Sequence, residues 1–282
     1  MKKVLFATTA LIATAGVASA DIAMSGSAEF GSASQAGGDS VIYSNANIKF
    51  TMSGVTDGGL EFGTSVDANA GGEDYDPGDW EVDGAETGAF GLGPIYVAMN
   101  GMKLSVDNGD IDNLYDDDFH HDVKFDYAQG PLSFSVTYGN VTAGEAEYSY
   151  TASVTQMGFT ATITGDEGDD NVTTKVEYAM APFTFGVEVD SAGAAESATT
   201  VSASYAEGAL SLSGETTTQD GVDDTWTFGV GYTVDALTLG LNIENDDDEN
   251  YATAAYALGG GANVIGGVKG DDSYYIGMNF SF

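Results

Sequence analysis

The chain has no cysteine, no arginine, only 4 prolines and only 2 histidines among its 282 residues. The absence of cysteine excludes disulfides and thiolate chemistry. The scarcity of proline suits a chain with many hydrogen-bonded strands. The two histidines are adjacent, and no spaced motif supplies the nucleophile and orienting acid that a catalytic triad needs. We therefore expect no enzymatic activity, with a hydrolase as the enzyme alternative.

The chain also has no long apolar run beyond its first 20 residues. Lys2 and Lys3 are followed by an apolar or small-residue stretch, 4–17, and by the A-x-A sequence of residues 18–20. This order is typical of a secretory signal peptide, which predicts a leader over residues 1–20 and a mature domain over 21–282. Because no later segment reaches the length of a membrane-spanning helix, the mature chain is either secreted or a membrane β-barrel.

Positive charge is scarce throughout. All 7 basic residues are lysine, two of them lie in the predicted leader, and the chain carries 44 aspartates and glutamates. Such an acidic chain repels nucleic acid and attracts cations, so we expect no nucleic-acid partner. A solvated acidic surface suited to a saline habitat also accounts for part of the excess.

Apolar and polar residues alternate with period two along many segments of about 8–11 residues, which is enough to cross a bilayer as a tilted strand. The clearest segments are 132–139, 183–190, 226–234, 237–244 and the C-terminal 274–282. In each, one face is strongly apolar and the other is small, polar or charged. A soluble β-sandwich would need large residues on the face that forms its core. Small polar residues instead favour a water-filled lumen.

Two kinds of connection alternate between these segments, short turns and longer acidic loops, as on the two rims of an outer-membrane barrel. The predicted hairpins are 40–70, 94–108, 122–141, 146–166, 171–190, 197–218, 223–245 and 249–269. With one strand at each end, 22–31 and 273–282, they make 18 strands. The predicted fold is therefore all-β, a transmembrane antiparallel β-barrel of 16–18 strands, wide enough for an aqueous channel.

Several segments resemble the alphaproteobacterial trimeric general porins of the Gram-negative outer membrane. They are IAMSG at 22–26, FTMSG at 50–54, DGGLEFG at 57–63, YALGGGA at 256–262 and the terminal Phe282. The resemblance implies a homotrimer of 16-stranded barrels, in contrast to the 18 strands counted above. It also implies a third external loop that folds into the pore, with carboxylates that face an arginine-rich wall. The long connection 71–93, with Trp80, is a candidate latch onto a neighbouring subunit.

The third external connection, 108–121, carries the acidic half of this pattern. Its candidate pore-constricting residues are Asp110, Asp112, Asp116, Asp117, Asp118, His120 and His121. The connection is shorter than its counterpart in the family, and the chain has no arginine to face it, so a more open and more negative pore is expected.

Lysine is the only basic residue available for the pore wall. Strand parity turns four lysines toward the lumen: Lys49, Lys103, Lys124 and Lys175. Alternatively, each simply neutralises a neighbouring carboxylate. We expect no cofactor. Two acidic runs are candidate calcium or magnesium sites that could bridge the rim to anionic lipid headgroups, although solvated charge explains either run as well. Their candidate ligands are Asp116, Asp118, Asp246, Asp247 and Asp248, with Glu249 next to the second run.

The sequence thus predicts an outer-membrane pore for passive diffusion of small hydrophilic solutes and ions, with a preference for cations. Its expected partners are outer-membrane lipid, lipopolysaccharide and further copies of the same chain. The alternative is a non-channel outer-membrane or secreted β protein that serves adhesion or binds divalent cations.

Overall fold

The computed structural model describes residues 18–76, 80–84, 90–107, 111, 122–139, 148–166, 171–192, 197–245 and 249–282. These residues form one continuous antiparallel sheet. Its strands are β1 (Ala18–Ser34), β2 (Val41–Thr56), β3 (Glu61–Asp76), β4 (Glu81–Gly84), β5 (Phe90–Leu92), β6 (Ile95–Met99), β7 (Met102–Asp107), β8 (Asp122–Gln129), β9 (Leu132–Tyr138), β10 (Tyr148–Gln156), β11 (Phe159–Asp166), β12 (Asn171–Met180), β13 (Phe183–Ala192), β14 (Ala198–Glu207), β15 (Leu210–Gln219), β16 (Thr225–Val234), β17 (Leu237–Glu244), β18 (Tyr251–Gly259), β19 (Ala262–Lys269) and β20 (Tyr274–Ser281).

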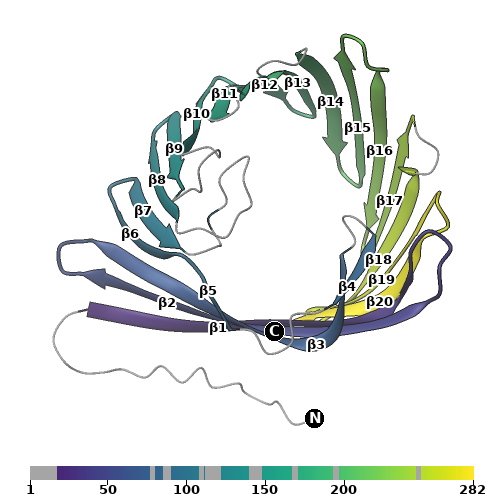
Figure 1. The fold of residues 1–282 in the computed structure, drawn as a ribbon, viewed down its shortest axis with the longest axis horizontal. Coiled ribbons are helices and arrows are strands. Elements are labelled where there is room, and N and C mark those ends of the chain that lie inside the picture. Colours follow the sequence, from purple (N-terminus) through teal and green to yellow (C-terminus); the bar gives the residue numbers. More distant parts are fainter. Residues whose placement is uncertain are drawn as a thin grey trace.

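The sheet closes on itself, because β1 pairs with β2 on one side and with β20 on the other (Figure 1). Strands β5 and β6 both pair with β3 and together act as one wall strand, interrupted at Gly93 and Pro94. Within the described residues, β4 pairs with β3 alone, so the closed wall has 18 strands. This count confirms the predicted hairpins. The 16 strands implied by the family resemblance are wrong for this chain.

The closed wall has an apolar outer face, as the period-two pattern predicts. In β13 the outward Phe183, Phe185 and Val187 are 41–47% exposed, whereas the intervening Gly186 is buried. The same alternation continues around the ring through residues such as Phe228 and Leu241, each 42% exposed. An exposed apolar band of this kind is stable only where hydrocarbon surrounds it, as in a membrane. No helix in the described ranges is long and apolar enough to cross a membrane.

Tight turns join the wall strands at one rim. The turn between β6 and β7 places Asn100 and Gly101 at φ angles of 53° and 80°. Two consecutive left-handed residues form a type I′ turn, whose backbone twist matches the right-handed twist of the strands that it joins. Asn-Gly is the preferred sequence for this turn. Met157 and Gly158 do the same between β10 and β11, at 54° and 84°. Both positions confirm predicted short connections.

The connection 71–93, predicted as a long acidic loop, contains regular structure. Strand β3 runs on to Asp76 and pairs with β4. The β2–β3 register shifts between Ser44, opposite Glu73, and Asn45, opposite Gly71, so that Gly72 has no register partner on β2; a bulge of this kind bends a strand. Beyond the bend, β4 lies inside the ring, next to the inner wall (Figure 1).

This inward turn gives the barrel an aromatic cluster on its inner wall. The cluster comprises Ala33, Tyr43, Tyr75, Trp80 and Tyr275, all at most 8% exposed. Trp80 is thus buried against its own barrel at 4% exposure. The prediction that Trp80 latches onto a neighbouring subunit is wrong, because its ring has no free surface to offer.

Candidate functional site

The inner wall of the barrel is the candidate functional site, and the aromatic cluster identifies which residues line it. Tyr43 lies on the inner face of β2. Because successive side chains of a strand point to opposite faces, the odd-numbered residues of β2 face inward and the even-numbered ones, including Ile48 and Phe50, face outward. The same parity places hydroxyl groups along the inner face of other strands, where they hydrogen-bond across the register. Ser133 and Ser153 are 2.6 Å apart at their hydroxyl oxygens, and Thr200 and Thr217 are 2.7 Å apart.

Three predicted wall lysines lie on this inner face beside carboxylates. The Lys49 ammonium is 3.3 Å from Asp67. Lys124 lies 4.0 Å from Asp126. Lys175 contacts carboxylates of two strands, Glu177 at 3.4 Å and Glu188 at 3.9 Å. All of these lysine side chains remain 39–48% exposed, so water screens each pair and each contributes little to stability.

Lys103 has a different neighbour. Its Nζ lies 4.7 Å from the centre of the Tyr96 ring, a cation–π contact between β7 and β6. Its register partner on β8 is Asp126, which also faces Lys124. The structure therefore places all four predicted lysines on the inner wall. Whether they act in conduction stays a prediction.

Carboxylates are more numerous than lysines on the same face of the described strands. Those assigned inward by strand parity include Glu29, Glu61, Asp67, Asp107, Asp126, Asp166, Glu177, Glu188, Asp190, Glu215 and Glu244. They lie on nine of the eighteen wall strands, from β1 to β17. The inner wall is therefore a hydrophilic, net acidic surface.

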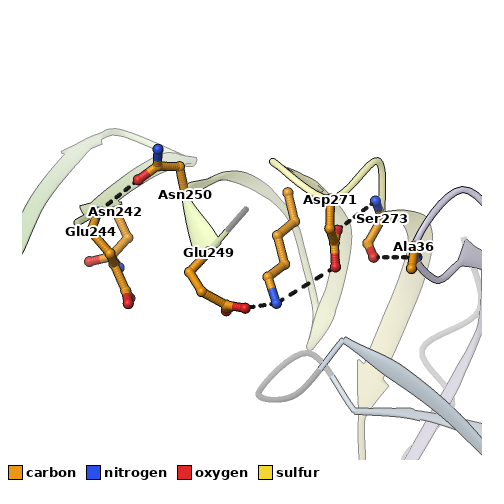
Figure 2. A network of polar contacts seen from close by, with 8 residues as sticks. Ala36, Asn242, Glu244, Glu249, Asn250, Asp271 and Ser273 are labelled. Carbon is orange, nitrogen blue, oxygen red and sulfur yellow. Dashed lines mark hydrogen bonds and ion pairs between the residues drawn. The ribbon is translucent and has the colours of Figure 1, made fainter. Parts of the chain in front are cut away.

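A fifth lysine, Lys269, forms a polar network at the outer rim that sequence reasoning missed (Figure 2). Its ammonium lies 2.8 Å from Glu249 and 3.8 Å from Asp271, and its side chain is only 11% exposed. The Ser273 amide donates to Asp271 at 2.9 Å, and the Ala36 amide donates to the Ser273 hydroxyl at 2.8 Å. The network joins the first and last external connections of the chain.

Asp271 is the member of this network whose carboxyl is held charged by its neighbours. Burial alone would raise its pKa, but hydrogen bonds from Ser273 and the nearby Lys269 ammonium bring the pKa below its ordinary value of 3.8. The sequence gives a single indication that Lys269 belongs to such a site: strand alternation at the end of β19 turns its side chain toward the lumen. Its partners Glu249 and Asp271 lie in different connections, and no spacing rule links them.

Other predicted site residues lie outside the described part of the chain. These are Asp110, Asp112, Asp116, Asp117, Asp118, His120 and His121, together with the candidate cation ligands Asp246, Asp247 and Asp248. Ile111, which is described, is buried at 6% exposure. Within the described ranges, no group of three or more aspartate, glutamate or histidine side chains is arranged to hold a metal ion.

A closed antiparallel wall with an apolar outer face and a polar, acidic inner face defines a transmembrane β-barrel channel. The chain belongs to the Gram-negative porin family, whose sequence model matches residues 7–280. This places it in the outer membrane, as predicted, and makes it a channel rather than an enzyme.

Known relatives agree with this assignment. A porin of Rhodobacter capsulatus is 28% identical over 292 aligned positions, which cover 84% of this chain and 90% of the relative. Engineered variants of the Rhodopseudomonas blastica porin have a similar fold. One such variant aligns with a TM-score of 0.58 at 16% identity, over 93% of this chain and all of the variant. At that identity the structural likeness supports the fold alone.

Proposed function

We propose that this porin is a water-filled diffusion channel that prefers cations over anions. The single observation that carries the proposal is the charge of the inner wall. Its described carboxylates come from nine of the eighteen wall strands, whereas its cations are a few lysines, most of them placed beside carboxylates. A fixed negative surface enriches counter-ions and excludes like ions within about one Debye length, ~10 Å at 0.1 M salt.

The test is a planar-bilayer recording of the purified, heat-modifiable protein in a KCl gradient. We expect stable ohmic steps and a reversal potential that favours K⁺. The preference should fade near ~1 M salt, where the Debye length shortens to ~3 Å. A reversal potential that favours Cl⁻ would overturn the electrostatic argument, and the absence of any conductance would favour the non-channel alternative.

Two aspects of assembly belong to the same proposal. We propose a homotrimer, supported by the family. Because the wall of described strands is closed, the subunits would associate through outer side chains. Native mass measurement in mild detergent should give three chains, and a monomer across a range of concentrations would contradict this.

We also propose cleavage before Asp21, which N-terminal sequencing of the exported protein checks.

Divalent cations at the acidic rim are the remaining proposal. Asp246, Asp247 and Asp248 could hold Ca²⁺ between the rim and the phosphates of lipopolysaccharide. Calcium should then raise the unfolding temperature in vesicles that contain lipopolysaccharide, and the Asp246→Asn/Asp247→Asn/Asp248→Asn variant should lose that increase. Equal increases in the unfolding temperature of both proteins would contradict a calcium site and indicate that calcium acts only by general screening of charge.

A further inference from the structure

The end of β3 and strand β4 form a small hairpin inside the barrel, here called the inner hairpin (residues 73–76 and 80–84). Its backbone register pairs Tyr75 with Val82. Figure 1 shows β4 inside the ring, on the side of β18 and β19. Any element at this place reduces the cross-section through which solutes pass.

Aromatic packing fixes the inner hairpin to the wall. The Trp80 ring meets Tyr275 edge-on at a centroid distance of 5.4 Å and Tyr251 at 5.7 Å. The Tyr75 ring lies 5.3 Å from Tyr43 and 4.8 Å from Tyr275. Aromatic pairs at these distances stabilise beyond the area that they bury. The hairpin therefore contacts strands from both ends of the chain.

The wall beneath the rings is shaped to receive them. A Cβ at Gly267 would lie 2.5 Å from the Tyr275 ring and 2.9 Å from the Trp80 ring. A Cβ at Gly31 or Gly277 would overlap the Tyr43 hydroxyl. The glycines therefore leave the space that these rings occupy.

Trp80 itself is held in an uncommon conformation. Its φ is 64°, in the left-handed region that bulky residues rarely occupy. A strained backbone persists where surrounding contacts determine it, and the contacts of Trp80 are those of the aromatic cluster. The conformation and the packing together indicate a fixed element.

The inner hairpin is also strongly acidic. Residues 73–84 contain six acidic residues and no basic residue. The register pairs on either side of Tyr75–Val82 are both acid with acid, Asp74–Asp83 and Asp76–Glu81. The backbone register thus brings acidic residues together on both strands of the hairpin.

We propose that the inner hairpin is a fixed acidic constriction of the pore and that Trp80 is the positioning residue that holds it there. The proposal rests on the channel function proposed above. It assigns to the second external connection a part in pore size and ion selection. Solutes pass between the acidic hairpin and the opposite wall.

Single-channel recording of Trp80→Ala and Trp80→Phe tests the anchor. Losing the ring should release the hairpin and raise conductance roughly 1.2–2-fold, with weaker cation preference. Trp80→Phe keeps an aromatic ring and should stay close to wild type. An unchanged conductance in a folded Trp80→Ala barrel would overturn the proposal.

The charge of the hairpin is tested separately with Asp74→Asn/Asp83→Asn. Cation preference should fall, whereas the matched control Asp223→Asn/Asp224→Asn, in the β15–β16 connection of the same rim, should change it less. Equal effects of the two variants would refute a special role for the hairpin. If the wild type shows no preference but Trp80→Ala still widens the pore, the constriction stands and the proposed selectivity fails.

The absence of cysteine allows a test that does not depend on Trp80. In Asp83→Cys, the introduced thiol is unique, and a bulky cationic thiol reagent should lower the single-channel current once it reacts. A reacted channel with an unchanged current would place residue 83 outside the current path and overturn the proposal. Reaction at a thiol in Asp57→Cys, in the β2–β3 turn, is the control.

Discussion

The charges of the inner wall are arranged unevenly at the scale of single residues. Lys175 lies between Glu177 and Glu188, so its one positive charge is shared by two carboxylates. Lys49 lies beside a single carboxylate, that of Asp67, and Lys103 lies against the Tyr96 ring. Each lysine thus lowers the local negative potential without reversing it. Removing a lysine should therefore change ion selection more than it changes stability.

We expect Lys175→Gln to shift the reversal potential further toward K⁺, because Glu177 and Glu188 lose their shared cation. The exposed pair should contribute only ~0.2–1 kcal/mol to the free energy of unfolding. Bilayer recording and urea unfolding measure the two effects. Lys175→Arg keeps the charge and serves as the control. A shift toward Cl⁻ in Lys175→Gln would contradict an acidic conduction path.

Asp271 predicts a pH dependence at the outer rim. Because its folded-state pKa is lowered, the stability it contributes is present above its ordinary value of 3.8 and is lost as the pH falls through the lower folded-state value. Asp271→Asn should therefore unfold at a lower temperature than wild type at pH 7, and the difference should vanish in strong acid. Asp57→Asn is the control. A difference that persists at low pH would rule out a charge effect.

At the scale of elements, strand alternation predicts most of the fold. Each wall strand places large apolar residues on one face, and period two leaves a single register that turns this face outward. The same rule locates Lys49, Lys103, Lys124 and Lys175 on the inner wall. The rule fails at residues 71–93, where glycines, acids and aromatic residues lack a clean period. The inner hairpin there depends on contacts of Trp80 with Tyr251 in β18 and Tyr275 in β20, 171 and 195 positions away in the sequence. No local pattern encodes such contacts.

Gly267→Val should dislodge the inner hairpin from the wall. A side chain there would collide with the Tyr275 and Trp80 rings, and overpacking of this kind typically costs about 1–3 kcal/mol. We expect a lower unfolding temperature and a raised conductance. Gly214→Val is the control, because the nearest atoms to its added Cβ are 4.0 Å away. Similar losses in both variants would point to a general penalty for valine in place of glycine.

The whole molecule has a formal net charge of −37 and an isoelectric point near 4.1. Like charges on one compact barrel repel each other, and dissolved salt screens this repulsion. We therefore expect the unfolding temperature to rise with NaCl concentration, most steeply between ~0.01 and ~0.1 M, where the Debye length falls from ~30 to ~10 Å. Sucrose at equal osmolality is the control. A fall in stability over this range would show that favourable ion pairs outweigh the repulsion.

The contacts of Trp80 also impose an order on folding. Its ring rests on Tyr251 and Tyr275, which join the barrel only when the C-terminal strands arrive. Contacts this distant in sequence form late, because a long loop must close first. The barrel should therefore assemble around an open interior, and the hairpin should seat only after β20 has paired with β1. Since Trp226 is the only other tryptophan, the fluorescence of a Trp226→Phe protein should report this final step during refolding, as a phase slower than strand formation.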